Sequence, residues 1–495
     1  MNTADGPHMP KAVDSAPLLF DKRRAGVLLH PTSLPSGELG PDAYRFVDFL
    51  TAAGSSVWQM LPLGPPHEEA SPYQCMSTHA GSERLISIAQ LVEWGWLAKD
   101  ADSLPRHIAL KAAREGLARA PAEVQDGYQR FKSEHAHWLN DYALYRALRA
   151  EYHGAAWWQW PAALRDRDAA AMTAAQQQLA AAVEQVRFEQ FAFFRQWLAL
   201  KQYANSRGLL LFGDLPIFVA HDSAEVWAQR TYFAIDEQGQ LLTVAGVPPD
   251  YFSATGQRWG NPLYRWERMQ ADGFAWWLAR LRTQLELYDL LRIDHFRGFE
   301  AYWEIPAEEP TAINGRWVQA PGEALFAALH QHIDPLPLIA EDLGVITPPV
   351  DALRRKYGLP GMKILQFAFD SGADNPYLPH NHERNSVVYT GTHDNATTLG
   401  WFDNLSVEQR QHVLDYLGAD AREAMPWPVI RAVLASVAGL AILPMQDVLA
   451  LGSEHRMNLP GTPTGNWSWR FEWAQIPEEI ASALRRMIEL YGRLG

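Results

Sequence analysis

Eight short apolar segments constrain the fold of this 495-residue chain more than any other feature of its sequence. Each is rich in leucine, isoleucine, valine or aromatic residues and ends in polar residues, glycine or proline. This pattern is typical of strands that are buried on both faces of a parallel sheet. The segments are residues 25–31, 56–64, 209–219, 290–296, 336–344, 362–369, 386–394 and 440–449.

Segments with helical periodicity lie between and after these strands. Strands that alternate with helices predict an α/β protein, and eight of them favour a closed (β/α)8 TIM barrel over residues 24–495. An open, doubly wound sheet has the same alternation and stays an alternative, because closure leaves no short mark in a sequence. The predicted helices cover residues 42–54, 186–208, 274–288, 323–333, 350–358 and 477–494.

Two connections between the strands are too long for simple loops. Residues 66–207 contain stretches rich in alanine, glutamine and arginine, such as 169–186, and predict a mostly helical insertion after the second strand. Residues 220–273 are rich in glycine, proline and aromatic residues and predict a loop-rich cap after the third strand. Insertions that follow strands lie at the carboxyl face of a barrel, where active sites form. Residues 1–23 are expected to be a flexible N-terminal segment.

Charge and cysteine content restrict the partners and the compartment. A net charge of −14 argues against nucleic acid and anionic membrane surfaces, which bind basic patches. The single cysteine, Cys75, excludes an internal disulfide framework and fits a reducing compartment. The sequence has no run of 18 apolar residues and its first 20 residues lack a signal-peptide core. We therefore expect a cytoplasmic protein that does not span a membrane; its oligomeric state is not predicted.

Polar residues follow several of the predicted strands. In a barrel these strand ends converge on one pocket, so the side chains meet in space. Several carboxylates on one rim suit glycoside chemistry, in which one carboxylate attacks and a second carboxyl protonates the leaving oxygen. Barrel-rim salt bridges are the structural alternative. The polar strand ends carry Asp214, Arg292, Asp294, His295, Arg297, Glu341, Asp342, Thr392, His393 and Asp394.

Metal and nucleotide sites have little support in the sequence. His135 and His137 form a His-x-His pair, but in a helical context positions i and i+2 point apart, so we expect both on the surface and no metal site. The turn GTHDN after the seventh strand is not the glycine-rich turn of a phosphate site. Neither GxGxxG nor GxxxxGK[ST] occurs, so no nucleotide cofactor is expected.

Longer stretches of the sequence, taken in order, are similar to one known family. Between about residues 24 and 471 they resemble amylomaltase, the 4-α-glucanotransferase family, and together they are far more specific than any one alone. The stretches are LLHPTSLPSGELGPDAYRFVDFLTAAGSSVWQMLPLGPP, SPYQ, GDLPIFVAHDSAEVW, GVPPDYFSATGQRWGNPLY, LLRIDHFRGFEAYWEIP, IAEDLG, GTHDN and NLPGTPTGNWSWR. Two stretches depart from the family pattern: SGELGPDAY is shortened, and SPYQCMSTHAGSERL has Cys75, His79, Ser82 and Glu83 in place of more usual residues.

The resemblance implies a retaining double displacement that moves α-1,4-linked glucan segments from a donor sugar to an acceptor sugar, without a cofactor. It also implies a barrel similar to the α-amylase clan but without a C-terminal β-sandwich. By position it assigns Asp294 as nucleophile, Glu341 as general acid/base and Asp394 as transition-state stabiliser. The substrate-binding residues it implies are Arg292, His393, Asp214, Tyr73, Tyr251, Phe252, Trp259 and Asn466.

Two other functions are alternatives to glucan transfer for such a barrel. A non-catalytic glucan-binding protein would have lost a carboxylate, and all three are present. A hydrolase of α-1,4-glucans would use the same chemistry and is the closer alternative. The aromatic cap favours transfer, because an apolar lid excludes water and stacks on an acceptor sugar.

Overall fold

The computed structural model describes residues 20–495 except 251–252, 421–422 and 463, so most of the expected N-terminal segment 1–23 lies outside the described residues. All eight predicted strands are present. Each is shorter than its predicted segment, and none extends more than one residue beyond it. They form one parallel sheet. The strands are β1 (Arg24–Leu28), β2 (Val57–Gln59), β3 (Leu210–Pro216), β6 (Leu290–Asp294), β9 (Leu338–Ala340), β10 (Gly361–Ile364), β11 (Ser386–Tyr389) and β12 (Leu440–Pro444).

The order of these strands makes the sheet a nearly closed barrel. It runs β10-β11-β12-β1-β2-β3-β6-β9, so the two ends of the order are consecutive in sequence. The backbone N–H of Ala340 in β9 donates to the carbonyl of Pro360, just before β10, at 2.9 Å. The (β/α)8 barrel is thereby confirmed, and the open doubly wound sheet is excluded.

The barrel interior is filled by alternate side chains of its strands. Leu28, Phe212, Ile339, Tyr389 and Ile442 come from five different strands, are buried, and belong to one apolar cluster. The side chains between them point outward to a second, larger cluster shared with the helices. This is why the strands are continuously apolar in sequence and were recognisable there.

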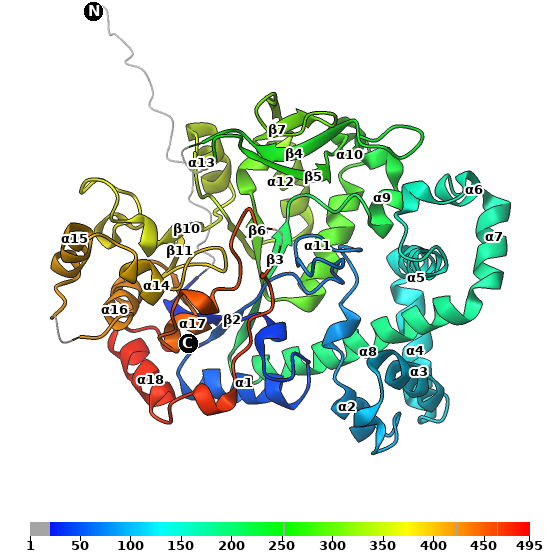
Figure 1. Cartoon of the computed structure of the whole chain (residues 1–495), viewed down its shortest axis with the longest axis horizontal. Helices are drawn as coiled ribbons and strands as arrows, with labels where there is room; N and C mark the ends of the chain where they lie inside the picture. Colours follow the sequence, from blue (N-terminus) through cyan, green and yellow to red (C-terminus); the bar gives the residue numbers. More distant parts are fainter. Residues whose placement is uncertain (1–19, 251–252, 421–422, 463) are drawn as a thin grey trace, which may run out of the picture.

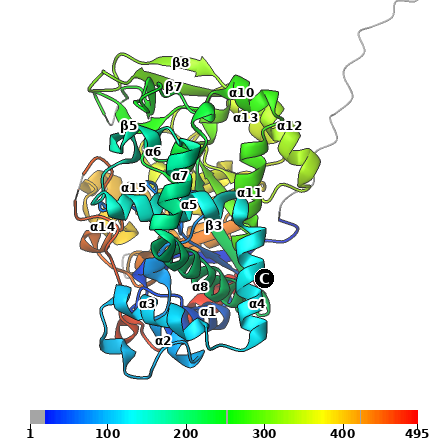
Figure 2. The same ribbon diagram turned by 90° about the vertical axis from the view of Figure 1, so that its right-hand side faces the viewer.

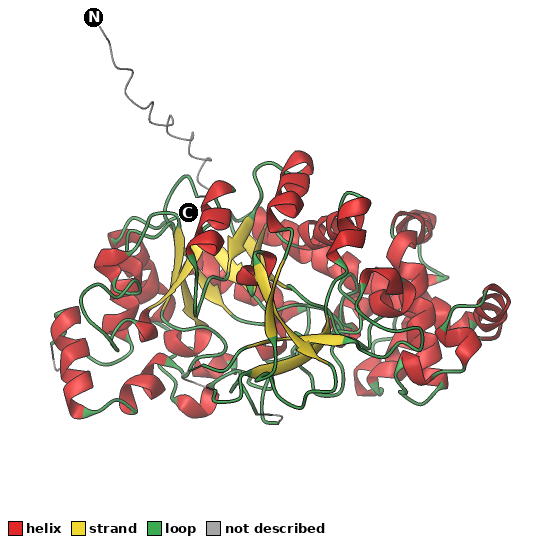
Figure 3. Ribbon diagram, turned by 90° about the horizontal axis from the view of Figure 1, so that it is seen from above, coloured by secondary structure: helices red, strands yellow, loops and turns green. Residues whose placement is uncertain are grey.

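Helices cover the outside of the barrel, with the strands in the middle of the molecule (Figure 3). The first helix begins with Pro41, whose fixed φ suits the first helical turn, and ends shortly before Gly54, which has φ 75°. The helices that follow the strands are α1 (Pro41–Ala52), α9 (Ala224–Ala228), α10 (Trp266–Ala271), α11 (Ala275–Leu287), α12 (Gly322–His332), α13 (Pro348–Lys356), α14 (Thr398–Asp403), α15 (Val407–Leu417), α16 (Trp427–Ala435), α17 (Met445–Val448) and α18 (Ile480–Leu490).

The segment between β2 and β3 is largely helical and lies to one side of the barrel (Figure 1). Figure 2 views the molecule from that side. The predicted helix 186–208 belongs to α8, which begins six residues earlier. The helices of this segment are α2 (Ile88–Glu93), α3 (Arg106–Leu117), α4 (Ala122–Glu134), α5 (Ala136–Glu151), α6 (Ala162–Arg165), α7 (Ala169–Gln178) and α8 (Ala180–Asn205).

One prediction for this segment is wrong. His135 does not lie on the surface: it occupies the junction of α4 and α5 and is 8% exposed. Its ring packs against those of Trp138 and Phe194, with centroids 5.7 and 5.2 Å away. His137 is exposed, as predicted. The argument from helical periodicity failed because a helix ends at His135, so the two histidines do not share one continuous helix.

A second, antiparallel sheet covers one end of the barrel, opposite α2 and α3 in Figure 2. Its order is β5-β4-β7-β8, so the cap between β3 and β6 contributes two strands and the segment after β6 contributes the other two. The sequence predicted a loop-rich cap for residues 220–273 and did not indicate these two strands. The strands are β4 (Thr243–Val247), β5 (Gln257–Pro262), β7 (Ala301–Pro306) and β8 (Arg316–Gln319). Within the described part of the chain, no helix combines the length and hydropathy needed to cross a bilayer.

Candidate active site

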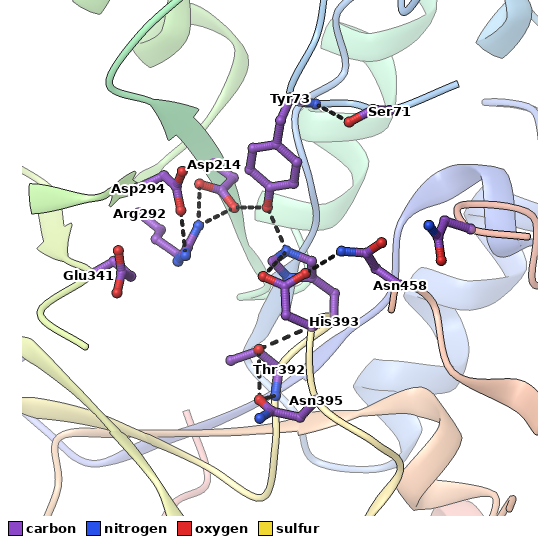
Figure 4. Close-up of polar contacts among 12 residues, drawn as sticks. Ser71, Tyr73, Asp214, Arg292, Asp294, Glu341, Thr392, His393, Asn395 and Asn458 are labelled. Carbon is purple, nitrogen blue, oxygen red and sulfur yellow. Dashed lines mark hydrogen bonds and ion pairs between the residues drawn. The ribbon is translucent and has the colours of Figure 1, made fainter. Parts of the chain in front are cut away.

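The expected catalytic side chains come from the carboxyl ends of three barrel strands. Asp294 is the last residue of β6, Glu341 directly follows β9, and Asp394 lies on the loop after β11. All three line one open pocket with about 1030 Å³ of empty volume. Figure 4 shows Asp294 and Glu341 on one side of the pocket and the loop of His393 on the other.

Arg292 joins two carboxylates at the floor of the site. Its Nη1 donates to both oxygens of Asp214, at 2.8 and 2.7 Å, and its Nη2 donates to Oδ1 of Asp294 at 2.7 Å. Asp214 and Arg292 are register partners in β3 and β6, which explains their contact. Burial opposes the charge of the guanidinium, but the two aspartates outweigh it and raise the pKa of Arg292 well above its usual value. The result is a fixed positive charge beside Asp294, whose side chain is 30% exposed toward the pocket.

Tyr73 connects Asp214 with His393. Its hydroxyl donates to Oδ2 of Asp214 at 2.8 Å and also lies 2.8 Å from Nε2 of His393. A hydroxyl has one proton, so Nε2 of His393 carries its own proton and donates to the tyrosine oxygen. The same Nε2 lies 3.3 Å from Oδ2 of Asp394. Burial, followed by the charge of Asp214, raises the pKa of Tyr73 well above its usual value, so the hydroxyl stays a donor.

Glu341 has surroundings unlike those of Asp294. Among the described residues, its two oxygens accept backbone N–H groups alone, from His295 at 2.7 Å and from Leu343 at 3.0 Å. His295 adopts a left-handed backbone conformation, φ 54°, as it turns from β6. Burial, with a further contribution from the charge of Asp294 and against the opposing charge of Arg292, raises the pKa of Glu341 to about 7. A carboxyl with that pKa can both give and take a proton near neutral pH.

Asp394 is held by a loop that the sequence analysis did not single out for this role. Nδ2 of Asn458 donates to Oδ1 of Asp394 at 2.6 Å, and the guanidinium of Arg456 donates to its backbone carbonyl at 2.7 Å. The backbone N–H of Asn458 also donates to the carbonyl of His393 at 3.1 Å. The only signal in the sequence was that Asn458 opens the quoted stretch NLPGTPTGNWSWR.

The remaining predicted binding residues have different positions. Trp259 on β5 lines the pocket, with its indole edge-to-face against the ring of His295 at 4.8 Å. Tyr251 and Phe252 lie outside the described residues. Asn466 is not brought to the pocket wall: its oxygen accepts the N–H of Leu459 and its amide donates to the carbonyl of Thr462, both at 2.9 Å. The next residue, Trp467, lines the pocket instead.

Other residues of the pocket wall were not predicted. Ser71 and Gln74 come from the loop of Tyr73, and Asn261 comes from β5. Asn261 is buried and donates to the carbonyl of Val219 at 2.9 Å. In the part of the chain that the structure describes, no group of three or more histidine, cysteine, aspartate or glutamate side chains is arranged to hold a metal ion. The pocket wall contains carboxylates, hydroxyl and amide groups and aromatic rings, and the buried guanidinium of Arg292 lies next to Asp294.

Comparisons with known proteins agree with one another. The family model described as 4-alpha-glucanotransferase matches residues 28–475. The 4-alpha-glucanotransferase of Thermus thermophilus is 49% identical over 95% of this chain and 99% of its own length. That of Synechocystis sp. is 48% identical over 96% of this chain and 99% of its own length. The solved structure of amylomaltase from Streptococcus agalactiae in complex with acarbose superposes with a TM-score of 0.92, at 37% identity, over 95% of this chain and all of that one.

Proposed function

The chain belongs to the 4-α-glucanotransferase family, and we propose that its pocket moves α-1,4-linked glucan segments from a donor to an acceptor sugar by a retaining double displacement. Donors and acceptors are malto-oligosaccharides or chains of starch and glycogen. The observation that carries the mechanism is the contrast between two carboxylates of one pocket. Asp294 accepts a hydrogen bond from a guanidinium, whereas Glu341 accepts backbone N–H groups and has a pKa that burial raises to about 7.

In the first step Oδ of Asp294 attacks the anomeric carbon of the donor. The bond from that carbon to the glycosidic oxygen breaks, and Glu341 gives its proton to the leaving oxygen. The released sugar departs, and the part of the donor that contains the anomeric carbon stays bound to Asp294 as a covalent ester. This division of labour fits the surroundings of each group, because Asp294 accepts a hydrogen bond from the positive Arg292 and burial favours the protonated form of Glu341.

In the second step an acceptor sugar replaces the released one. Glu341, now a carboxylate, takes the proton of the acceptor hydroxyl as its oxygen attacks the anomeric carbon. The ester bond to Asp294 breaks, so Asp294 and Glu341 return to their starting forms. Two inversions at one carbon retain the α configuration.

The other polar groups are proposed to hold the reacting sugar. Asp394 is 44% exposed toward the pocket, and its negative charge would stabilise the positive charge that develops on the sugar ring. The network of Tyr73, Asp214, Arg292 and His393 gives the floor fixed donors and acceptors for sugar hydroxyls. These contacts raise the rate to the extent that they strengthen in the transition state.

Transfer rather than hydrolysis requires that a sugar, not water, reaches the ester. We propose that Trp259 forms an apolar cover over the acceptor. The position of Trp259 against His295 supports this role. Hydrolysis of the same substrates is the alternative, and it differs in a measurable product.

Incubation with maltotriose tests the proposal. Transfer gives glucose together with maltotetraose and longer chains, while the number of reducing ends stays constant. Glucose and maltose alone, with reducing ends rising in step, would refute transfer in favour of hydrolysis. Asp294→Asn is expected to abolish both products, whereas Asp374→Asn, at an exposed aspartate, serves as the matched control.

We also propose the cytoplasm as the compartment of this reaction. The support is the single cysteine and the absence of an apolar run of membrane-spanning length in the sequence. Fractionation of cells that express the full chain tests this, and recovery of the protein with the membrane or outside the cell would contradict it.

A further inference from the structure

The barrel has a seam directly beside Glu341. In the part of the chain that the structure describes, β9 and β10 are the one pair of neighbouring barrel strands without a ladder of backbone hydrogen bonds. A single backbone bond joins them, from the N–H of Ala340 to the carbonyl of Pro360. In a regular parallel pair the N–H of Met362 would next donate to the carbonyl of Ala340. It donates instead to the side chain of Asp342, at 2.7 Å from Oδ1.

The carboxylate of Asp342 is fixed in this seam from other directions. Its Oδ2 lies 3.3 Å from Nε of Arg354, a buried arginine on α13. Arg354 also donates to the carbonyl of Leu359, at 3.0 Å, on the segment that leads into β10. Gly361 lies so close that a methyl group at its Cα would overlap the Asp342 carboxylate. The seam is therefore built around this one side chain, which the glycosyl transfer mechanism does not use.

The backbone of Glu341 depends on both of its neighbours in the barrel. Toward β6, its N–H donates to the carbonyl of Ile293 at 3.0 Å, and its carbonyl accepts the N–H of Phe296 at 3.1 Å. Toward β10, the next residue along the chain, Asp342, supplies the attachment. Successive side chains of an extended chain point to opposite sides, so the same backbone that sends Asp342 into the seam sends Glu341 into the pocket.

We propose that Asp342 is a positioning residue for the acid/base Glu341: by joining β9 to β10 through the N–H of Met362, it holds the Glu341 carboxyl where it can protonate the leaving sugar. The inference rests on the proposed role of Glu341. A displacement of a catalytic group by about 1 Å can cost about a hundredfold in rate, so a small opening of the seam is measurable. The fold does not depend on this side chain alone, because the Ala340–Pro360 bond remains.

Two donor substrates distinguish a loss of Glu341 positioning from general damage to the active site. Maltotriose needs a proton on its leaving oxygen, whereas α-maltotriosyl fluoride releases fluoride without one when Asp294 attacks. We expect Asp342→Ala to slow glucose release from maltotriose about 10- to 100-fold, while the first-turnover burst of fluoride stays within about threefold of the wild type. Equal slowing of both donors, or no slowing of either, would overturn the proposal.

Two further variants test the seam without removing the whole side chain. Asp342→Asn keeps an oxygen for the N–H of Met362, so it is expected to recover most of the maltotriose activity. Gly361→Ala keeps Asp342 but displaces its carboxylate, so it is expected to behave like Asp342→Ala with both donors. If Asp342→Ala does not fold, these two variants decide: an inactive Asp342→Asn or a fully active Gly361→Ala would each contradict the proposal.

Two controls keep this test separate from the proposed function. Asp351→Ala removes a different partner of Arg354, which donates to it at 2.7 Å, and leaves the bond from Met362 to Asp342 intact. It is expected to act at the wild-type rate on both donors, and the same selective loss in Asp351→Ala as in Asp342→Ala would move the effect from the seam to Arg354. Asp294→Asn is expected to abolish the fluoride burst. A full burst in that variant would refute Asp294 as nucleophile without bearing on the seam.

Discussion

Replacement of Glu341 by glutamine is expected to change the stability of the protein in a pH-dependent way. The pKa of this carboxyl is raised to about 7 in the folded protein and is about 4.5 in an unfolded chain. A raised pKa means that the folded state holds the proton more tightly. The stability that this proton confers is fully present below pH 4.5 and is lost as the pH rises through 7. A glutamine has no proton to lose, so the variant does not suffer this loss.

The size of the effect follows from the two pKa values. Between pH 5 and pH 8 the wild type should lose about 2 to 3 kcal/mol of stability relative to Glu341→Gln. Glutamine also carries a constant penalty, because its NH2 group must face one of the two backbone N–H groups, of His295 or Leu343, that now donate to the carboxylate. That penalty is the same at both pH values and cancels when the two differences are compared.

Thermal unfolding measures this difference. A chain of 495 residues has an entropy of unfolding of about 1 kcal/mol per kelvin, so the melting temperature of the variant relative to the wild type should rise by about 2 to 3 °C from pH 5 to pH 8. Glu308→Gln, at an exposed glutamate, is the matched control and should show no such change. The same melting-temperature difference at pH 5 and pH 8 would show that Glu341 does not bind its proton more tightly in the folded protein, and the acid/base argument would lose its basis.

Three further results are expected from kinetics. With saturating acceptor, kcat for maltotriose should fall about tenfold per pH unit above about pH 7, because Glu341 must be protonated in the first step; a flat profile to pH 9 would contradict this. Tyr73→Phe should lower kcat/KM about 10- to 100-fold, because Asp214 and His393 each lose a hydrogen bond to the hydroxyl, and unchanged kinetics would remove Tyr73 from the site. Asn458→Ala should lower kcat by about 10-fold or more through Asp394, and a change in KM alone would show that Asn458 serves binding only.

The barrel could be predicted from the sequence because its strands are buried on both faces. β12, for example, is buried at all five positions and is continuously apolar, and the polar residues Gln446 and Asp447 follow after one methionine. The second sheet could not be predicted in the same way. β8 has four residues, three of them exposed, and β5 begins with two exposed residues and contains Gly260 and Pro262. Such short edge strands are specified by the partners they pair with rather than by a pattern of their own.

The candidate site shows the same division. Asp214, Arg292, Asp294 and Glu341 were predictable because each lies within two residues of the carboxyl end of a strand, and the barrel brings strand ends together. The loop after β12 has no such rule. Asn458 lies 14 positions after Pro444 in the sequence, and only the path of that loop brings Asn458 to Asp394. The same loop directs the side chain of Asn466 toward other residues of the loop and not toward the pocket. Asn458 and Asn466 nevertheless belong to the same stretch of sequence that resembles the family.

The different chemistry of Asp294 and Glu341 arises from which groups the two strand ends face. The floor between β3 and β6 holds Arg292, so the carboxylate of Asp294 receives a charged hydrogen bond. Glu341 follows the shorter β9, at the edge of the seam, and its hydrogen bonds within the described part of the chain come from backbone N–H groups. Neutral donors stabilise a carboxylate less than a guanidinium does, so burial outweighs the opposing charge of Arg292 and raises the pKa of Glu341 to about 7. A second cation placed beside Glu341 would lower this pKa and weaken the group as an acid.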